Sequence, residues 1–540
     1  MRLAAFLPVV LCLGLVACGQ SQNSGGQSSD ASSSGSSGGG GTMAKMEPVV
    51  SVDGGQIRGQ IKDGVASYLA IPYAASPTGN LRWMPPQPVA AWDGVRDATQ
   101  YGASCMQGQF GPAPTGTDDN KGPKTSEDCL FVNVWTPEDA KGKNLPVMLW
   151  VHGGAYILGS GSLPMYEGTG FAKSGVVLVT INYRLGNLGF FAHPAIDGQD
   201  PNGEHGNYAF MDQKAALKWV QNNIAKFGGD PNNVTLFGQS AGGASVGYLL
   251  TMPSAKGLYQ KVIMESGSIR SAVRPLKDSS GGEKSAEEMG QEMAKALGLD
   301  NPSAEDLREI PAAKLMAPPA GRFMPGPIED GKDVMGPTYT ELAEGNFNHV
   351  PVLLGANSYE VSIMRGADKA VPGVLGAHLD QALKLYDGYG TGDKDMKLKQ
   401  IAGDIFMVDG ARNYAESLAK AGVPTYLYHF DYVASFQRAT MPGTGHIFEI
   451  PFVFDTVNQW SDKATDEDRA YAKKVHPYWV AFAKDSNPNG DDRPMWPQFN
   501  TDSKTVMYFG PKGPEAKQDF EGKRLDFLDK IGVTSLTPKR

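Results

Sequence analysis

The sequence predicts an α/β fold in which a mostly parallel sheet is covered by helices on both faces. Apolar runs with the length of buried strands alternate along the chain with a helical pattern. The clearest strand runs are residues 130–135, 146–152, 176–182 and 234–237. Between the last two, residues 212–227 carry an apolar stripe at helical spacing, made of Ala216, Trp219, Val220 and Ile224. Such alternation is typical of a parallel sheet that is buried on both sides.

Further elements are predicted on either side of this region. Three short strand patterns near the start predict a small N-terminal antiparallel sheet, at residues 49–52, 56–59 and 65–70. More apolar strands that extend the main sheet are predicted at residues 261–265, 350–355 and 425–430. The segments 271–345 and 362–424 are richer in helix-forming and loop residues. We expect them to lie over the carboxyl edge of the sheet as lid insertions.

Composition agrees with a large globular domain. The chain has 540 residues, of which 41% are hydrophobic and 20% are charged, and this is ordinary for a protein with a sizeable core. Its net charge is -9, with 49 basic against 58 acidic side chains. This balance gives no basic surface, so nucleic acid is not expected as a partner.

The N-terminus has the pattern of an export signal. Met1-Arg2 carries a positive charge, residues 3–16 form an apolar run too short to span a membrane, and Leu15-Val16-Ala17-Cys18 follows. These last four residues resemble the bacterial lipobox, in which the cysteine is lipidated, so residues 1–18 are predicted to be a lipoprotein signal peptide. An ordinary signal peptide with an incidental cysteine is the alternative. Gly19 after the cysteine favours the outer membrane for this exported, lipid-anchored protein.

A flexible tether is predicted to follow at residues 19–46. It consists almost entirely of Ser, Gly, Gln and Asn up to residue 42, and such a composition cannot bury enough apolar surface to fold. The folded domain is therefore predicted to span residues 47–540. A lipid anchor to the membrane is the partner expected for this end of the chain.

Cysteine usage predicts one disulfide. Of the four cysteines, Cys12 would leave with the signal and Cys18 would be lipidated, which leaves Cys105 and Cys129. Two cysteines in an exported protein are expected to pair. No Cys/His spacing indicates zinc, and no Gly-x-Gly-x-x-Gly follows a strand, so neither a metal nor a cofactor is predicted.

The most informative local pattern is Gly238-Gln239-Ser240-Ala241-Gly242-Gly243. It follows the strand run 234–237 and precedes an apolar, small-residue stretch at 244–250, which is the strand–turn–helix context of a nucleophile elbow. The turn is too tight for side chains at 238 and 242, so both positions need glycine. Ser240 is thereby predicted to be a nucleophile at the N-terminus of a helix, where the helix dipole favours an oxyanion.

Several longer motifs resemble the type-B carboxylesterase/cholinesterase family, including the bacterial para-nitrobenzyl esterases. They are Glu127-Asp128-Cys129-Leu130, His152-Gly153-Gly154-Ala155-Tyr156, Asn182-Tyr183-Arg184-Leu185-Gly186, Gly206-Asn207-Tyr208 through Asp212-Gln213, Phe227-Gly228-Gly229-Asp230-Pro231, and Tyr478-Trp479 with Trp496-Pro497. The resemblance covers nearly the whole chain from residue 47 onward. It implies the α/β-hydrolase fold, in agreement with the predicted elements.

The resemblance also indicates the partners of the serine. His446 lies in Gly445-His446-Ile447-Phe448-Glu449, which is similar to the family's histidine loop, with Ile447 in place of a glycine. Glu360 matches the family's acid, although Tyr359 and Val361 replace the usual Asp and Gly. The order serine, acid, histidine along the chain fits this assignment. Asp404 and Asp409 are the alternative candidates for the acid.

Backbone N–H groups are expected to form an oxyanion hole. One donor is that of Ala241, the residue after the nucleophile. By family position the others belong to Gly154 and Ala155, and Ala155 stands where a third glycine is more common. Gln239 replaces the family's usual glutamate before the serine, which removes a buried charge.

The predicted function is hydrolysis of carboxylic esters by a Ser-His-Glu triad through an acyl-enzyme intermediate. A non-catalytic, cholinesterase-like binding or adhesion protein is the alternative from another class, and a specialised esterase for a bulky xenobiotic, toxin or polymeric ester is a further one. Choline esters are disfavoured, because choline recognition needs an aromatic wall and residues 106–128 contain no tryptophan. The expected partner is therefore a small-molecule ester. The sequence does not predict an oligomeric state.

Overall fold

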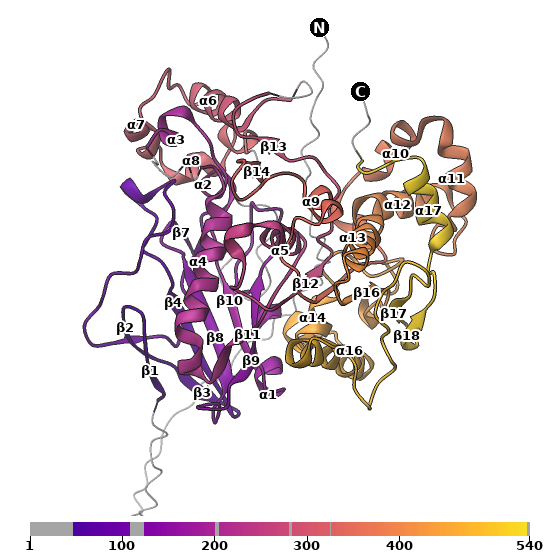
Figure 1. Ribbon diagram of the computed structural model, residues 1–540, viewed down its shortest axis with the longest axis horizontal. Helices are drawn as coiled ribbons and strands as arrows, with labels where there is room; N and C mark the ends of the chain where they lie inside the picture. The colour runs from indigo at the N-terminus through magenta and orange to yellow at the C-terminus, as the bar shows by residue number, and fades with distance from the viewer. Residues whose placement is uncertain are drawn as a thin grey trace, which may run out of the picture.

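The computed structural model describes residues 47–108, 124–199, 203, 205–279, 283–324 and 326–536 (Figure 1). The predicted signal peptide, Cys18 and the tether to residue 46 lie outside the described residues. Among the described residues, no helix combines the length and apolar composition needed to cross a bilayer.

The described chain is organised around one large mixed sheet of eleven strands. From edge to edge it contains β18 (Gly513–Lys517), β17 (Val506–Gly510), β16 (Thr425–Phe430), β15 (Val352–Asn357), β12 (Lys261–Glu265), β11 (Gly229–Gln239), β9 (Leu145–Val151), β10 (Val177–Ile181), β8 (Phe131–Pro137), β4 (Val65–Pro72) and β3 (Gln60–Lys62). All pairs from β17 to β10 are parallel. The pairs at both edges are antiparallel. The mostly parallel sheet predicted from the sequence is therefore present.

Helices cover both faces of this sheet, and strand β9 shows how its side chains are divided between them. Val147, Leu149 and Val151 belong to a hydrophobic cluster shared with the helices of one face. Met148 and Trp150 belong to a second cluster on the opposite face. The first face is covered by α4 (Tyr208–Asn223), α5 (Ala241–Thr251) and α13 (Asp409–Lys420). The second is covered by α1 (Thr169–Lys173), α14 (Ile450–Val453) and α16 (Asp466–Asp485). A strand buried on both faces has no polar side, which is why the parallel strands carry continuous apolar runs such as Val147–Val151 and Val262–Met264.

The small N-terminal sheet differs in part from its prediction. Strands β1 (Val49–Val52) and β2 (Gly55–Arg58) are antiparallel, and β5 (Val95–Asp97) adds to β2. The predicted strand at 65–70 does not join them, because β4 lies in the main sheet between β3 and β8. The reason lies in its burial. Six of the eight residues of β4 are buried, whereas β1 and β2 each have one buried residue among four.

The two segments predicted as lids hold most of the remaining helices. The first contains α6 (Ala286–Ala296), α7 (Ala304–Arg308), α8 (Ala312–Met316) and α9 (Thr338–Glu344), with the short strands β13 (Arg274–Pro275) and β14 (Ile328–Glu329). The second contains α10 (Ala367–Leu375), α11 (Leu379–Leu385) and α12 (Lys394–Gly403). In Figure 1 α6–α8 lie at the upper left and α10–α12 at the upper right. Helix α13 lies in the second segment but is not part of a lid. Its buried Tyr414, Ala415 and Leu418 belong to the hydrophobic cluster on the first face of the sheet.

The remaining short elements connect these parts. They are β6 (Ser104–Cys105), β7 (Thr125–Ser126), α2 (Gly186–Gly189), α3 (Pro194–Asp197), α15 (Val457–Trp460) and α17 (Gly522–Lys530). Strands β6 and β7 pair in parallel and bring Cys105 toward Cys129.

Candidate active site

Ser240 occupies the turn between strand β11 and helix α5. Its backbone has φ 57° and ψ -125°, a conformation that a residue with a Cβ rarely adopts. Such a conformation costs about 1–3 kcal/mol and persists where the surroundings impose it. Ser240 is partly exposed, whereas Gln239 before it and Ala241 after it are buried. The turn therefore presents this one side chain at the end of the strand.

Close backbone packing explains the glycines of this turn. A Cβ at Gly242 would lie 2.0 Å from the carbonyl oxygen of Val151, and one at Gly238 would lie 2.6 Å from the same atom. Both distances are shorter than any carbon–oxygen contact, so strand β9 leaves no room for a side chain at either position. The prediction that 238 and 242 require glycine is confirmed.

His446 lies against Ser240 although 206 residues separate them. Its Nε2 is 2.7 Å from the Oγ of Ser240, within hydrogen-bond distance. Its Nδ1 is hydrogen-bonded to an Oε2 oxygen of Glu360. The imidazole is 1% exposed and Glu360 is fully buried, so both side chains are shielded from bulk water. The structure thus brings together Ser240, His446 and Glu360, the three side chains singled out in the sequence.

The second oxygen of Glu360 is held by two donors. Oε1 accepts hydrogen bonds from the Ser266 hydroxyl at 2.7 Å and from the Asn357 N–H at 2.6 Å. A buried carboxylate is stable only when its oxygens are hydrogen-bonded or paired. These donors therefore fix the carboxylate with its other oxygen directed at the imidazole.

The acid loop and the histidine loop are joined by hydrogen bonds that do not involve the side chains of Glu360 and His446. The Tyr359 N–H donates to the Thr444 carbonyl at 2.9 Å, and the Thr444 N–H donates to the Ser358 Oγ at 2.8 Å. The His446 N–H donates to the Ser362 Oγ at 2.9 Å. These contacts set the separation of Glu360 from His446 independently of their side chains.

The two alternative acids lie in other ion pairs. The Asp404 carboxylate is 2.7 Å from the Arg524 Nε, and the Asp409 carboxylate is paired with Arg270. Neither is hydrogen-bonded to His446 in the described structure. Of the three carboxylates considered in the sequence, Glu360 is the one that the fold places on the imidazole.

The residues predicted to form the oxyanion hole lie beside the serine turn. Gly154 and Ala155 follow strand β9, which neighbours β11, and Ala241 begins helix α5. Within the described ranges, the N–H groups of these three residues make no hydrogen bond to the protein. Ala155 has φ 52°, so the alanine adopts the left-handed conformation that a glycine would adopt without strain. The glycine-to-alanine change keeps this N–H donor.

Two side chains that support His446 were not predicted from the sequence. The Gln239 amide and the Asn357 amide, the latter at 3.1 Å, both donate to the His446 carbonyl oxygen. An ionised glutamate has no hydrogen to donate, so Gln239 makes a contact that the family's usual residue cannot make in its charged form. The sequence identified Gln239 as a departure and gave no partner for it.

A buried pair of carboxyls lies behind this support. Asn357 also donates to the Glu449 side chain, and the Trp479 indole donates to Glu265 at 2.7 Å. Burial raises the pKa of Glu265 to about 8. Burial also raises the pKa of Glu449 well above its usual range, and the nearby Glu265 raises it further. Burial thus disfavours the charged form of both carboxyls, which limits the negative charge behind the imidazole.

The glycines replaced in the two loops do not require glycine here. Val361 lies in a 3-10 turn at 360–363 and is buried in a cluster with Leu375 and Ile401. Ile447 packs against the cluster of the second sheet face. Neither belongs to the described residues with positive φ. A branched side chain at these positions is therefore compatible with the loop conformations.

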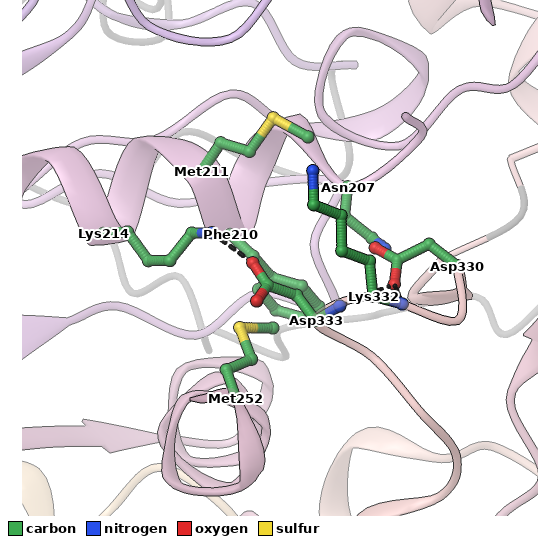
Figure 2. Close-up of a pocket in the computed structure, with 8 residues that line it drawn as sticks. All are labelled: Asn207, Phe210, Met211, Lys214, Met252, Asp330, Lys332 and Asp333. Carbon is green, nitrogen blue, oxygen red and sulfur yellow. Dashed lines mark hydrogen bonds and ion pairs between the residues drawn. The ribbon is translucent and has the colours of Figure 1, made fainter. Parts of the chain in front are cut away.

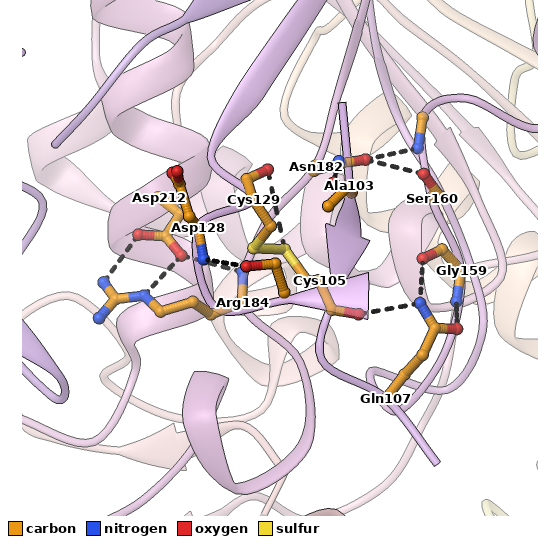
Figure 3. The surroundings of a disulfide bond; sticks show 12 residues. Ala103, Cys105, Gln107, Asp128, Cys129, Gly159, Ser160, Asn182, Arg184 and Asp212 are labelled. Atoms are coloured by element: carbon orange, nitrogen blue, oxygen red, sulfur yellow. Dashed lines mark hydrogen bonds and ion pairs between the residues drawn. A yellow bond between two sulfur atoms is a disulfide. The ribbon is translucent and has the colours of Figure 1, made fainter. Parts of the chain in front are cut away.

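The predicted disulfide is present (Figure 3). Cys105 and Cys129 are bonded, with their Cα atoms 5.0 Å apart, and both are buried. Next to the bridge, Arg184 and Asp212 form a buried ion pair at 2.7 Å. The disulfide thus ties β6 to the start of β8.

A separate hollow lies between helix α4, the end of helix α5 and the loop that holds residues 330–333 (Figure 2). Its polar lining is an ion pair of Lys214 with Asp333, and Asp330 accepts from the Asn207 amide at 2.9 Å. None of the residues predicted for the site lines it. Among the described residues, no group of three or more His, Cys, Asp or Glu side chains is arranged to hold a metal ion.

Three features together define an α/β-hydrolase: this sheet order, a serine on a strained strand–helix turn, and an acid and a histidine that follow the serine in sequence. The "Carboxylesterase family" model matches residues 46–384 and 375–528. The chain is 34% identical to fumonisin B1 esterase of Sphingopyxis macrogoltabida over 477 residues, 84% of this chain and 85% of that protein. It is also 34% identical to para-nitrobenzyl esterase of Bacillus subtilis over 473 residues, 85% of this chain and 94% of that protein.

Solved structures agree with these matches. A PNB esterase superposes with a TM-score of 0.76 at 30% identity, covering 89% of this chain and 99% of that one. A carboxylesterase of Geobacillus stearothermophilus gives a TM-score of 0.74 at 32% identity, covering 88% and 98%. The chain belongs to the carboxylesterase family and is a carboxylic ester hydrolase. The family resemblance and the α/β-hydrolase fold predicted from the sequence are confirmed.

Proposed function

We propose that the protein cleaves esters with Ser240 as nucleophile, His446 as general base and Glu360 as the group that orients the imidazole. The observation that carries this proposal is the 2.7 Å contact between the His446 Nε2 and the Ser240 Oγ, with Nδ1 bonded to a buried carboxylate. A serine hydroxyl is a weak nucleophile until a base removes its proton. The donor–acceptor distance permits that transfer without rearrangement.

The chemistry follows from these positions. The Ser240 Oγ attacks the ester carbonyl carbon while its proton passes to His446 Nε2, and Glu360 stabilises the imidazolium. The carbonyl oxygen becomes an oxyanion, which the N–H groups of Gly154, Ala155 and Ala241 are assigned to bind. His446 then protonates the leaving alkoxide, and an acyl-enzyme remains on Ser240. Water activated by His446 releases the acid and regenerates the serine.

A non-catalytic binding protein is the alternative from another class. Such a protein would have no requirement for the alignment of three side chains from β11, the loop after β15 and the loop before α14. The burial of the Glu360 carboxylate and the strained backbone of Ser240 each cost folding free energy, and a protein without a catalytic role would have no reason to keep them. These two features favour the catalytic proposal.

The substrate class proposed is an alkyl or aryl ester of a small acid. Relatives at 30–34% identity have names that refer to different substrates: fumonisin B1 esterase, para-nitrobenzyl esterase and phenmedipham hydrolase. The proposed triad acts on the ester carbonyl whatever the alcohol, so the residues that surround the alcohol would determine which ester is preferred. A specialised ester of larger size is the competing proposal.

We expect p-nitrophenyl esters of short acids to be hydrolysed with KM values between about 1 μM and 1 mM. Choline esters should have kcat/KM values at least about 30-fold lower than p-nitrophenyl esters of the same acids. A factor of about 30 corresponds to about 2 kcal/mol, the scale of the cation–π attraction that an aromatic wall would supply to choline. A panel of p-nitrophenyl esters of rising acyl length, measured beside choline esters of the same acids, tests this. Efficient hydrolysis of acetylcholine would overturn the substrate proposal.

We also propose that Cys18 carries a lipid that anchors the protein to the bacterial cell envelope, at the outer membrane. The support is the lipobox-like sequence 15–18 and the tether that follows it. The variant Cys18→Ser should move the protein from the detergent-extracted fraction to the soluble fraction. Cys12→Ser, a change within the signal but outside the lipobox, is the matched control and should leave it with the membrane. A wild-type protein that already fractionates as soluble, without lipid on its N-terminus, would contradict the proposal.

A further inference from the structure

The loop after strand β9 returns on itself directly beyond the assigned oxyanion donors. The Gly154 carbonyl accepts hydrogen bonds from the N–H groups of Ile157 at 3.0 Å and Leu158 at 3.1 Å. Where this turn closes therefore determines where the N–H groups of Gly154 and Ala155 point. The residue that ends the turn is Gly159.

Gly159 lies against the backbone that leads into the oxyanion hole. It has φ 118°, and a Cβ there would be 2.4 Å from the His152 Nδ1 and 2.6 Å from the Gly153 carbonyl oxygen. His152 is itself fixed, because its ring stacks on Tyr183 and its carbonyl accepts from the Tyr183 hydroxyl at 2.7 Å. A shift of Gly159 would thus displace or release residues 153 and 154.

One side chain from outside this loop binds both backbone polar groups of Gly159, its N–H and its carbonyl. The Gln107 Oε1 accepts from the Gly159 N–H at 3.0 Å, and the Gln107 Nε2 donates to the Gly159 carbonyl at 3.0 Å. Figure 3 shows the amide of Gln107 facing Gly159 in this way. Because donor and acceptor are both engaged, the amide fixes the position and the orientation of the Gly159 backbone together.

The Gln107 side chain is fixed in turn by the disulfide. Its Nε2 also donates to the carbonyl of Cys105 at 3.1 Å, and Cys105 is bonded to Cys129 next to strand β8. A second connection runs in parallel, since the Asn182 Oδ1 accepts from the Gly161 N–H at 2.9 Å and its Nδ2 donates to the Ala103 carbonyl at 3.1 Å. Residues 103–107 therefore serve as a fixed support for residues 159–161.

We propose that Gln107 is a positioning residue, which places the oxyanion-hole loop through Gly159 and is itself anchored by the Cys105–Cys129 disulfide. The proposal rests on the assignment of Gly154 and Ala155 as oxyanion donors in the proposed function. Gln107 is assigned no contact with substrate. Its effect is expected on the transition state. A misplaced N–H donor weakens the binding of the developing oxyanion more than the binding of the uncharged carbonyl of the bound ester.

The test is the variant Gln107→Met, which keeps the length of the side chain and removes its amide. We expect kcat for p-nitrophenyl acetate, per active site titrated with a fluorophosphonate, to fall about 10- to 100-fold, with KM within about threefold of the wild-type value. The Kd of a trifluoromethyl ketone, which forms an oxyanion adduct on the serine, should rise by the same factor. Gln221→Met is the matched control. Gln221 lies on helix α4, and its amide also donates to two backbone carbonyls, those of Pro231 and Leu258, at 2.9 Å each.

The outcomes separate the proposal from a general loss of stability. A fall in kcat per titrated site in Gln107→Met but not in Gln221→Met supports positioning, and a wild-type kcat per titrated site overturns it. If Gln107→Met does not fold, Gln107→Asn decides in the same way, since it keeps an amide that is too short to reach both groups of Gly159. Ser240→Ala measured in parallel tests the proposed function alone. An inactive Ser240→Ala beside an unimpaired Gln107→Met would sink this inference and leave the triad proposal standing.

The anchoring part of the proposal has its own readout. The pair Cys105→Ser/Cys129→Ser should lower kcat per titrated site, and adding Gln107→Met to it should cause less than the product of the separate losses. Strictly multiplicative losses would show that the disulfide and Gln107 act independently, which contradicts the proposed anchoring.

Discussion

Alanine at position 240 will lower kcat for p-nitrophenyl acetate by about 10⁵- to 10⁶-fold, the scale found when the serine of another triad is removed. The change deletes the Oγ that lies 2.7 Å from His446 and leaves no other hydroxyl hydrogen-bonded to Nε2 in the described site. The fold should be kept, because serine and alanine both carry a Cβ and are strained to a similar degree at φ 57°. Steady-state kinetics together with a thermal melt check both parts.

A second serine provides the control for this prediction. Ser254 lies on the surface beyond helix α5, where its Oγ donates to Asp333 at 2.9 Å. Ser254→Ala should have a kcat within about twofold of the wild-type value, as most surface changes away from a site do. Substantial ester hydrolysis by Ser240→Ala, above that of the free reaction in buffer, would show that another group is the nucleophile.

Glutamine at position 360 will lower kcat by about 10⁴-fold without unfolding the protein. The reason is the fixed orientation of this side chain. The Ser266 hydroxyl and the Asn357 N–H both donate to Oε1, so a glutamine keeps its oxygen there and turns its NH₂ group toward the His446 Nδ1. The imidazole is then held with its proton on Nε2, the tautomer that cannot accept the serine proton. The measurement is the pH–rate profile of Glu360→Gln with its circular dichroism spectrum.

The alternative acids provide the control for Glu360. Asp409→Asn and Asp404→Asn remove carboxylates that pair with Arg270 and Arg524. Each should lower the thermal stability, because an arginine loses its buried partner, and each should leave kcat per folded enzyme within about threefold. The double variant Ser240→Ala/Glu360→Gln should be no slower than Ser240→Ala, since the three groups act as a unit. Normal activity in Glu360→Gln beside an inactive Asp409→Asn would move the role to Asp409.

Much of the fold could be predicted because the central residues of the parallel strands are apolar and buried. The predicted range 261–265 matches β12, and 425–430 matches β16, since both are buried at every residue. The strand at 65–70 was assigned to the wrong sheet, because periodicity shows that a strand is buried but not which strand it pairs with. Helix α13 was taken as part of a lid for the same reason, as its apolar stripe does not identify the surface that it packs against.

The candidate site could be predicted where local motifs carry it. Ser240 has its glycine-rich turn, and His446 and Glu360 lie in loops that resemble those of the family. Its supports could not be predicted, because they depend on contacts across the fold. Gln239 meets the His446 carbonyl across 207 residues, and Gln107 meets Gly159 across 52. A single amide has no sequence signature until its partner is known.

The central claim is that Ser240 becomes covalently acylated during turnover. The most direct measurement is mass spectrometry of the enzyme mixed with p-nitrophenyl acetate and quenched in acid within the first turnovers, followed by mapping of the modified peptide. The account predicts one acetyl group on the peptide that contains Ser240, formed at the rate of the p-nitrophenol burst. The acetylated enzyme should accumulate when deacylation is slower than acylation. The acetyl group should be missing from Ser240→Ala. An acetyl group on another residue that forms at the burst rate and persists in Ser240→Ala would contradict it.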